Sequence, residues 1–565
     1  MKRNRHAEAA DALHEALGAS PPIELVDRLL YDLGKSLYRL KLFHSALEHF
    51  SKVLEAGPTS SYFNAALEWT LFIGRQMVDD RSVNEVLTRY GSTEQFPDQY
   101  RDEFFFRLAR YHFSRSVEAE RDATMPVQIS RGREDDSVSF SGDLFGTASG
   151  QTKSEDTKSS KKGISVGEDL FSSGSKSAEQ DDSISLSGDL FGTGERGPPV
   201  SEVGSLTADT HLTQAERFAL RVNPDSTYGA RAKFLEALVL FKRRKENEAL
   251  GAFKEVVRLT REDDRRSSRR LREMAFFQLA RTHFGAQQPT FSNFYYGKID
   301  RDSVEWLDSL YEESWSQFRL GNYEKALGNL LTLHSPFFGS SYYPESRILE
   351  AVIYYENCRY KEAKDILTRF QARYEPVLVA IQQITEKYDS AAQFVAVLDG
   401  LENEDIAPSA EDAEKSILAQ ILQLALADPD LARVARSLEE VRREKAQAQV
   451  AGLRPSTASA LDGILSNEMS DLEERAGRAV ERRLREEREN IKSLLQQAVR
   501  IDIETARSEQ ERIESRLREV QSRPKDSKQT FVEWTDDEKL VWPFEGEYWR
   551  DELGTYELTL ARSCR

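Results

Sequence analysis

The stretch from Gly34 to Phe50, GKSLYRLKLFHSALEHF, decides the fold of this 565-residue chain. It places a small residue twelve positions before an alanine and a large apolar residue four positions after that alanine. Two antiparallel helices pack closely only where their contact residues are small, so this spacing predicts a helix-turn-helix hairpin. Three further stretches repeat it. The predicted repeat-packing residues are Gly34, Ala46 and Phe50; Ala237, Ala249 and Phe253; Ser314, Ala326 and Leu330; and Ala351, Ala363 and Leu367.

These hairpins resemble the tetratricopeptide repeat (TPR). Three of them carry an aromatic residue three positions before the alanine, at Phe43, Tyr323 and Tyr360, and Pro58 lies where that family closes its second helix. The second hairpin departs from the pattern, with Glu246 at the aromatic position and no closing proline, so the pattern does not predict its turn. The resemblance implies an all-α, TPR-like α-solenoid whose stacked hairpins expose a concave surface for binding other proteins.

Charge and cysteine content limit the classes of partner. The formal net charge of −18 argues against nucleic acid or an anionic membrane, because phosphate binding requires clustered Lys and Arg. No apolar run is long enough to span a bilayer, so we expect no direct membrane insertion. The cysteines Cys358 and Cys564 are too few for a disulfide framework or a Cys-rich zinc site, and they leave the redox compartment open.

Catalytic motifs are absent from the sequence. It contains no Gly-rich phosphate loop, no Gly-x-Ser-x-Gly elbow and no His-Glu-x-x-His stretch. His44 and His49 share a predicted helix but are five residues apart, which places them on different faces. We therefore expect a non-enzymatic protein without cofactor, metal or small-molecule substrate, and an enzyme with an unrecognised site is the remaining alternative.

Composition and repeat spacing divide the chain into six segments. The predicted domains are N-terminal TPR-like repeats at 1–116, a disordered insertion at 117–212, further TPR-like repeats at 213–376, an irregular helical region at 377–460, a long charged helix at 461–523 and an aromatic-rich C-terminal segment at 524–565. The helix at 98–115 opens a repeat whose second helix follows only after the insertion, around Ala219.

The insertion repeats an Asp-Leu-Phe motif on a polar background rich in Ser, Gly, Asp and Lys. Such a composition buries too little apolar surface to offset chain entropy, which predicts disorder. Isolated Leu-Phe pairs on one tether are typical of linear docking motifs, and tandem duplication without a role is the alternative. The candidate docking residues are Leu144, Phe145, Leu170, Phe171, Leu190 and Phe191.

Two features of the C-terminal third leave alternatives open. The long helix is rich in Glu and Arg and its heptads are interrupted, so it packs back on the solenoid or pairs with a partner helix. The last segment contains Trp534, Trp542 and Trp549 among other aromatic residues. It forms either a cap on the preceding helices or an interaction patch, in which case Trp542 and Trp549 are candidate docking residues.

The N-terminus reads as half a hairpin. Residues 6–18 form an amphipathic helix without a first helix before it, which predicts that the natural chain begins upstream of Met1. The repeats and the terminal YWRDELGTY, Tyr548 to Tyr556, are similar to TPR components of the myxobacterial gliding-motility machinery. This resemblance implies a scaffold in a cell-envelope assembly, periplasmic or envelope-associated. A cytoplasmic signalling or chaperone adaptor is the alternative.

Overall fold

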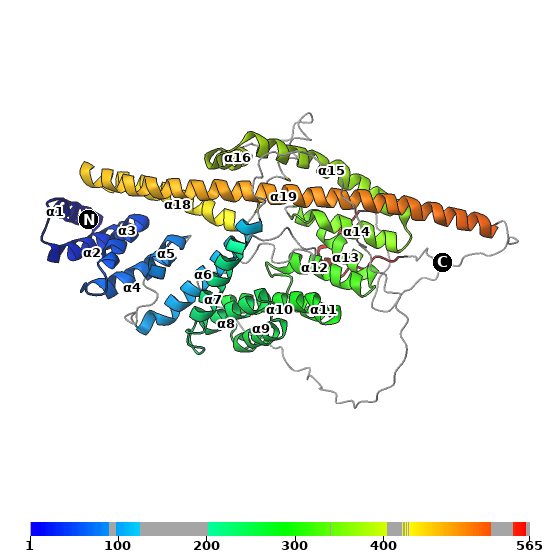
Figure 1. The fold of residues 1–565 in the computed structure, drawn as a ribbon, viewed down its shortest axis with the longest axis horizontal. Coiled ribbons are helices and arrows are strands. Elements are labelled where there is room, and N and C mark those ends of the chain that lie inside the picture. The colour runs from blue at the N-terminus through cyan, green and yellow to red at the C-terminus, as the bar shows by residue number, and fades with distance from the viewer. Residues whose placement is uncertain are drawn as a thin grey trace, which may run out of the picture.

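The computed structural model describes residues 2–78, 80–89, 98–124, 202–339, 341–403, 429–520 and 546–560, together with 421, 424, 426 and 427. These residues form helices joined by short turns and contain no β-strand. Figure 1 shows successive helices packed beside one another in a curved array, with one very long helix lying across it. The fold is a TPR-like α-solenoid.

The solenoid is built from helices that pack against their neighbours in sequence. The first part consists of α1 (Lys2–Gly18), α2 (Ile23–Arg39), α3 (Phe43–Glu55), α4 (Phe63–Gly74), α5 (Arg81–Arg89), α6 (Arg101–Thr124) and α7 (Glu202–Ala219). The second part consists of α8 (Gly229–Lys242), α9 (Glu246–Thr260), α10 (Arg266–Gly285), α11 (Pro289–Tyr296), α12 (Trp306–Arg319), α13 (Tyr323–Leu333), α14 (Pro344–Glu356), α15 (Tyr360–Lys387) and α16 (Ala391–Asn403).

Small residues lie where the helices of each predicted hairpin meet. The alanines at 46, 249, 326 and 363 are all 0% exposed. Gly34 in α2 faces Phe50 in α3 so closely that an added Cβ would lie 2.9 Å from the Phe50 ring. A larger side chain at this position would push the two helices apart, which is the physical reason for the small residue in the repeat.

A left-handed turn residue joins the helices of five hairpins. Lys41, Arg244, Gln287, Gly321 and Cys358 have φ angles of 63°, 59°, 61°, 76° and 55°. Each lies two positions before the first residue of the second helix. The turn at Arg244, which the sequence pattern did not predict, therefore has the same backbone form as the others.

Arg244→Gly is expected to stabilise the protein by about 1 kcal/mol, because glycine adopts a positive φ without the steric cost paid by other residues. Lys254→Gly, at an exposed position in the middle of α9, is the matched control and is expected to destabilise by about 1 kcal/mol. Urea unfolding of both variants measures the difference. Equal destabilisation by the two substitutions would contradict the assignment of the turn.

Helices α6 and α7 correct the edges of the predicted insertion. α6 continues to Thr124 and α7 begins at Glu202, so residues 117–124 and 202–212 are helical. Apolar residues within these stretches are buried, with Ala208 and Leu212 3% and 5% exposed and Val117 packed against the same core as Leu212. The three Asp-Leu-Phe motifs lie outside the described residues.

The boundary predicted at residue 376 falls inside a helix. α15 runs through Pro376 to Lys387. Proline removes one backbone donor, but Tyr374, Val377 and Ile381 on either side are buried in one apolar cluster, and this packing keeps the helix continuous. At the other end of the chain, α1 packs on α2 with Ala10 fully buried, so its apolar stripe is covered.

The longest helix, α19 (Pro455–Val520), has 66 residues and is about 100 Å long at 1.5 Å per residue. Together with α18 (Pro429–Val450) it packs back on the solenoid, against α1 and α3 near its start and against α14, α15 and α16 farther along. Leu461 and Leu472 belong to the N-terminal core, whereas Val480 and Ile501 belong to a second core with α15. Between them, an added Cβ at Gly477 would lie 2.1 Å from the carbonyl oxygen of Ala391, so α16 begins in direct contact with α19.

Helix α18 is fixed to the repeats by a buried carboxylate. Glu444 accepts hydrogen bonds from the backbone N–H groups of His44 and Ser45 at 3.0 and 3.1 Å, in the first turn of α3. It also contacts His44 Nδ1 at 2.9 Å and accepts the Ser45 hydroxyl at 3.0 Å. Glu444 thus caps α3 from a helix that is 400 residues distant in sequence.

This contact is expected to depend on pH. Burial by itself lowers the pKa of His44, but the hydrogen bond and negative charge of Glu444 outweigh it and raise that pKa above 6.5. A raised folded-state pKa gives stability that is fully present below pH 6.5 and is lost as the pH rises through the folded value.

Glu444→Gln is therefore expected to lower the free energy of unfolding by about 1–2 kcal/mol near pH 6, on the scale of a lost helix cap, and by less near pH 9. Denaturant unfolding of the wild-type protein and the Glu444→Gln variant at the two pH values measures this difference in the free energy of unfolding. A difference that stays constant with pH would contradict a charged His44.

Candidate functional site

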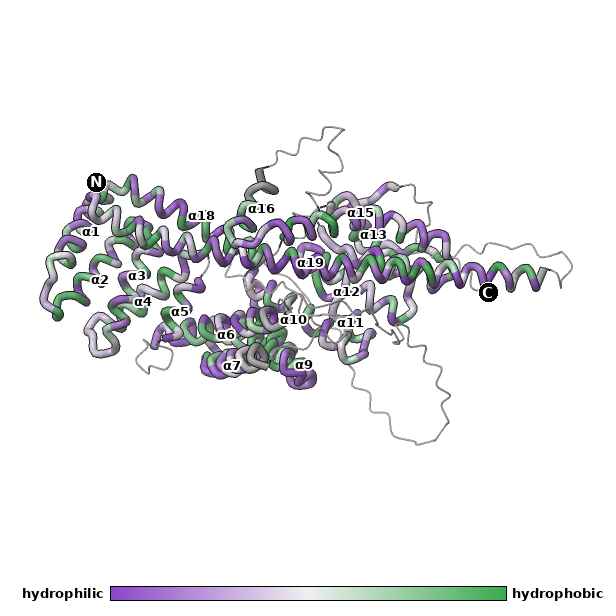
Figure 2. The backbone as a smooth tube through the Cα atoms, turned by 45° about the horizontal axis from the view of Figure 1, so that its top comes forward, coloured by the Kyte–Doolittle hydropathy of each residue, from purple (hydrophilic) through white to green (hydrophobic). Residues whose placement is uncertain are grey.

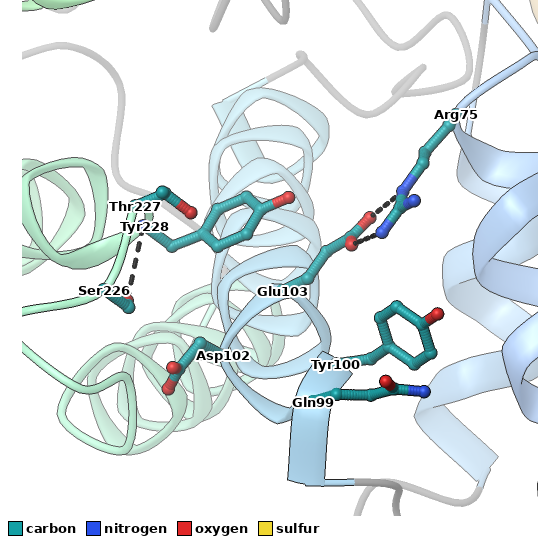
Figure 3. A pocket seen from close by; sticks show the side chains of 8 residues that line it. All are labelled: Arg75, Gln99, Tyr100, Asp102, Glu103, Ser226, Thr227 and Tyr228. Atoms are coloured by element: carbon teal, nitrogen blue, oxygen red, sulfur yellow. Dashed lines mark hydrogen bonds and ion pairs between the residues drawn. The ribbon is translucent and has the colours of Figure 1, made fainter.

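One surface pocket lies between α4, α6 and the turn before α8. Its volume is about 370 Å³, and its lining residues are Arg75, Gln99, Tyr100, Asp102, Glu103, Ser226, Thr227 and Tyr228 (Figure 3). The guanidinium of Arg75 forms two hydrogen bonds with the Glu103 carboxylate, which also accepts one from Arg107 at 3.1 Å. Arg75 packs over the Tyr100 ring at 5.7 Å from its centroid.

The charges of this pocket are already used to hold helices together. Burial alone would raise the pKa of Glu103, but the hydrogen bond from Arg75 and the charge of Arg107 hold it below its usual value. Asp102 accepts the backbone N–H of Asn223 at 2.8 Å, which ties α6 to the turn after α7. An ionised, fully paired carboxylate is a poor general acid or base, so the pocket is best explained as a structural ion pair at a helix junction.

A second site is formed where the C-terminal segment docks on α13. Residues 546–560 lie beside α13, as the red segment in Figure 1, and their contacts with Thr332 and then Glu324 show that they run opposite to the helix. The Gly554 N–H donates to the Thr332 hydroxyl at 2.9 Å, and the Leu558 N–H donates to the Glu324 carbonyl at 3.2 Å. From the repeats, Lys325 Nζ donates to the Gly554 carbonyl at 2.9 Å.

Three apolar side chains anchor this segment. Leu553, Tyr556 and Leu560 are 5%, 7% and 8% exposed, although the segment has no regular helix apart from one short 3-10 turn at Arg550–Glu552. Leu560 is part of a buried cluster with residues of α12, α13 and α14. The repeats thus hold an extended peptide by its backbone and by spaced apolar side chains, which is a known mode of peptide recognition.

Gly328 determines how closely the segment approaches. A Cβ at this position of α13 would lie 1.6 Å from the carbonyl oxygen of Tyr556, so only glycine permits the observed contact. Sequence reasoning missed this residue and the surface around it. The available signal was a glycine inside an amphipathic helix, two positions after Ala326, where glycine weakens the helix without an evident reason.

The predicted site residues are distributed along the whole solenoid. The repeat-packing residues other than Pro58 are buried, and Pro58 is exposed after α3. Trp549 lies in the docked segment and is 42% exposed, and its backbone N–H donates to the Tyr556 hydroxyl at 2.8 Å. The candidate docking residues of the insertion and Trp542 lie outside the described residues. The structure therefore brings the hairpin residues together in pairs but gathers them into no single site.

Among the described residues, no group of three or more His, Cys, Asp or Glu side chains is placed to hold a metal ion. No helix in the described ranges is long and apolar enough to cross a membrane. Cys358, in the α14–α15 turn, is disulfide-bonded. The sequence contains one other cysteine, Cys564, which follows the described C-terminal segment.

One comparison with known protein families agrees with the repeat architecture of the first helices. A tetratricopeptide repeat family model matches residues 1–61, which span α1 to α3. A solved structure described as a circular tandem repeat protein with novel repeat topology and enhanced subunit contact surfaces is 13% identical, covering 89% of this chain and 91% of that one at a TM-score of 0.17. No curated protein matches the chain.

Gly328→Ala is expected to release residues 546–560 from α13, because the new methyl group takes the place of the Tyr556 carbonyl oxygen. Hydrogen exchange at the Gly554 and Leu558 amides should rise by tenfold or more, and Trp549 should become more accessible to a fluorescence quencher. The matched control is Gly251→Ala in α9, where nothing lies within 4 Å of the added Cβ. The control should leave the segment protected and stabilise α9 by about 1 kcal/mol. Unchanged protection in both variants would contradict the docked arrangement.

Proposed function

We propose that this protein is a non-catalytic scaffold that binds extended segments of other proteins on the α12–α14 surface. The observation that carries the proposal is the docked C-terminal segment, which occupies this surface as an intramolecular ligand. TPR-like solenoids are in general protein-binding scaffolds rather than catalysts. In the pocket between α4, α6 and the turn before α8, Arg75 and Glu103 pair with each other and Asp102 accepts a backbone N–H, which supports the same conclusion.

The bound segment indicates the chemistry of a partner. Lys325 and Arg301 donate to main-chain carbonyl oxygens of Gly554 and Asp551, at 2.9 and 2.8 Å, so they recognise an extended backbone rather than particular side chains. Specificity then comes from the buried side chains, with Leu560 packed among residues of α12, α13 and α14 and Tyr556 buried where the segment folds back on the Trp549 backbone. We expect a partner segment with an aromatic residue followed four positions later by leucine, next to a glycine that passes over Trp306 as Gly554 does.

A partner must displace the segment before it binds. Because the segment belongs to the same chain, its effective concentration at α13 exceeds that of a free peptide in dilute solution. A free peptide of the same sequence therefore binds the intact protein weakly. Weakening the segment in the chain should strengthen binding of the free peptide.

The test uses a labelled peptide of residues 546–560 and the full chain carrying Tyr556→Ala and Leu560→Ala. Fluorescence anisotropy should show at least tenfold tighter peptide binding to this variant than to the wild-type chain. A peptide with the same two substitutions is the control and should not bind. Adding Gly328→Ala to the chain variant should abolish binding of the wild-type peptide. Failure of the chain variant to bind any peptide would overturn the proposal.

We further propose that the scaffold works in a cell-envelope assembly, as the resemblance to gliding-motility TPR proteins implies. The disulfide at Cys358 supports an oxidising compartment, since disulfides persist there and are rare in the cytosol. Fractionation of the native host shows in which compartment the protein is found, and alkylation of free thiols without reductant shows whether Cys358 is oxidised. Together the two measurements distinguish an envelope scaffold from a cytoplasmic adaptor. Recovery in the cytosol with Cys358 fully alkylated would support the adaptor instead.

A further inference from the structure

The distal part of α19 carries a stripe of exposed apolar residues that lies outside the surface on which residues 546–560 dock. Val499, Ile503, Ile513 and Leu517 are 47%, 63%, 53% and 56% exposed. The exposed residues Ala506 and Gln510 complete the series, so the positions 499, 503, 506, 510, 513 and 517 are spaced alternately by four and three. This is the a/d spacing of a coiled-coil seam.

The stripe lies opposite the face with which α19 contacts the solenoid. Ile501 and Thr505 are buried, the Ser508 hydroxyl lies 3.2 Å from the Tyr355 hydroxyl, and Arg512 donates to a carbonyl of the α14–α15 turn at 2.9 Å. At about 100° per residue these docked positions and the stripe fall on opposite sides of the helix. Figure 1 shows the end of α19 projecting past α14, and in Figure 2 the same end projects past α15.

We propose that this stripe pairs with the same stripe of a second copy of the chain, in antiparallel orientation. The sequence of the stripe is complementary to itself when reversed: Val499 lies opposite Leu517 of the second copy, and Ile503 opposite Ile513. Gln510 lies opposite the small Ala506, so the single long polar side chain meets the single small one. In the parallel orientation Gln510 would meet Gln510 and Ala506 would meet Ala506, which leaves one layer polar and the next underfilled.

Charges beside the stripe agree with this register. Arg500 lies opposite Glu514 of the second copy at both ends of the seam, and opposite charges at such flanking positions set orientation. Near the centre of the seam, Arg507 would face Arg507 of the second copy, and Glu509 would face Glu509 of the second copy. Both are already neutralised within the chain, Arg507 by Glu511 at 3.1 Å and Glu509 by Lys364 at 2.6 Å.

The helix is formed before the second copy arrives. Contacts of Ile501, Ser508 and Arg512 with the solenoid hold residues 501–512 of the seam in place, so helix formation there adds no cost to pairing. The seam is shorter than three heptads, and we therefore expect a dimer that dissociates in the micromolar range. This inference does not depend on the proposed peptide-binding function.

Sedimentation velocity of the full chain over a hundredfold concentration range tests the dimer. Wild-type protein should shift from monomer to dimer, and Ile503→Glu with Ile513→Glu should weaken the association at least tenfold. Both side chains are exposed, so the unfolding midpoint should not fall. Val379→Glu on α15, where Val379 is 50% exposed away from the stripe, is the matched control and should dimerise normally. A monomer at every concentration, or equal association of all three proteins, would overturn the proposal.

Cross-linking tests the orientation. A mixture of Ile503→Cys chains and Ile513→Cys chains should form a disulfide between the two substituted positions under mild oxidation, identified by peptide mapping so that native cysteines do not interfere. Neither chain alone should form it, since the two copies of one position lie about 15 Å apart at 1.5 Å per residue. Efficient cross-linking of Ile503→Cys with itself would show a parallel pair and overturn the antiparallel arrangement.

Discussion

The continuity of α19 is the constraint on which the rest of the structure depends. In an ordinary solenoid each repeat contacts only its neighbours, so the array bends by small changes summed over many interfaces. Here one hydrogen-bonded rod contributes Leu461 and Leu472 to the core of the first repeats and Val480 and Ile501 to the core around α15. The distance between these two parts is therefore set by helix rise rather than by the intervening hairpins. Glu444 locks the neighbouring helix α18 to the start of α3, and its buried charge is satisfied only in that position.

This bracing has a consequence for the peptide site. The surface on α13 belongs to repeats that α19 holds through α14 and α15, and the segment that occupies it follows α19 in the chain. A rigid surface loses little entropy when a peptide binds, so the cost of binding falls mainly on the peptide. Because α19 both supports this surface and precedes the segment in the chain, the state with residues 546–560 bound is favoured. A partner therefore gains access by competing with the segment, and the repeats do not have to open.

Sequence reasoning identified what local packing dictates and missed what long-range contact dictates. The spacing of Gly34, Ala46 and Phe50 predicts a hairpin because the three residues meet within one repeat. Gly328 and Gly477 look like ordinary helix glycines, since the atoms that require them, in Tyr556 and Ala391, are distant in sequence. The same holds for Glu444, whose role as a cap of α3 cannot be read from a Glu-rich helix. Pro376 shows the converse, because tertiary packing overrides a local signal that ends most helices.

Exposed apolar residues on this protein fall into two kinds. Phe291 and Phe294 on α11 are 57% and 56% exposed, and Phe294 is covered in part by the ammonium group of Lys298 at 5.0 Å from its ring centroid. Such isolated residues are common on protein surfaces and need no partner. The stripe on α19 differs because its members recur at heptad spacing on one face while the other face is docked. Periodicity, rather than exposure alone, distinguishes a surface shaped for another helix from one that is merely apolar, and on α19 it occurs on the face that the solenoid leaves uncovered.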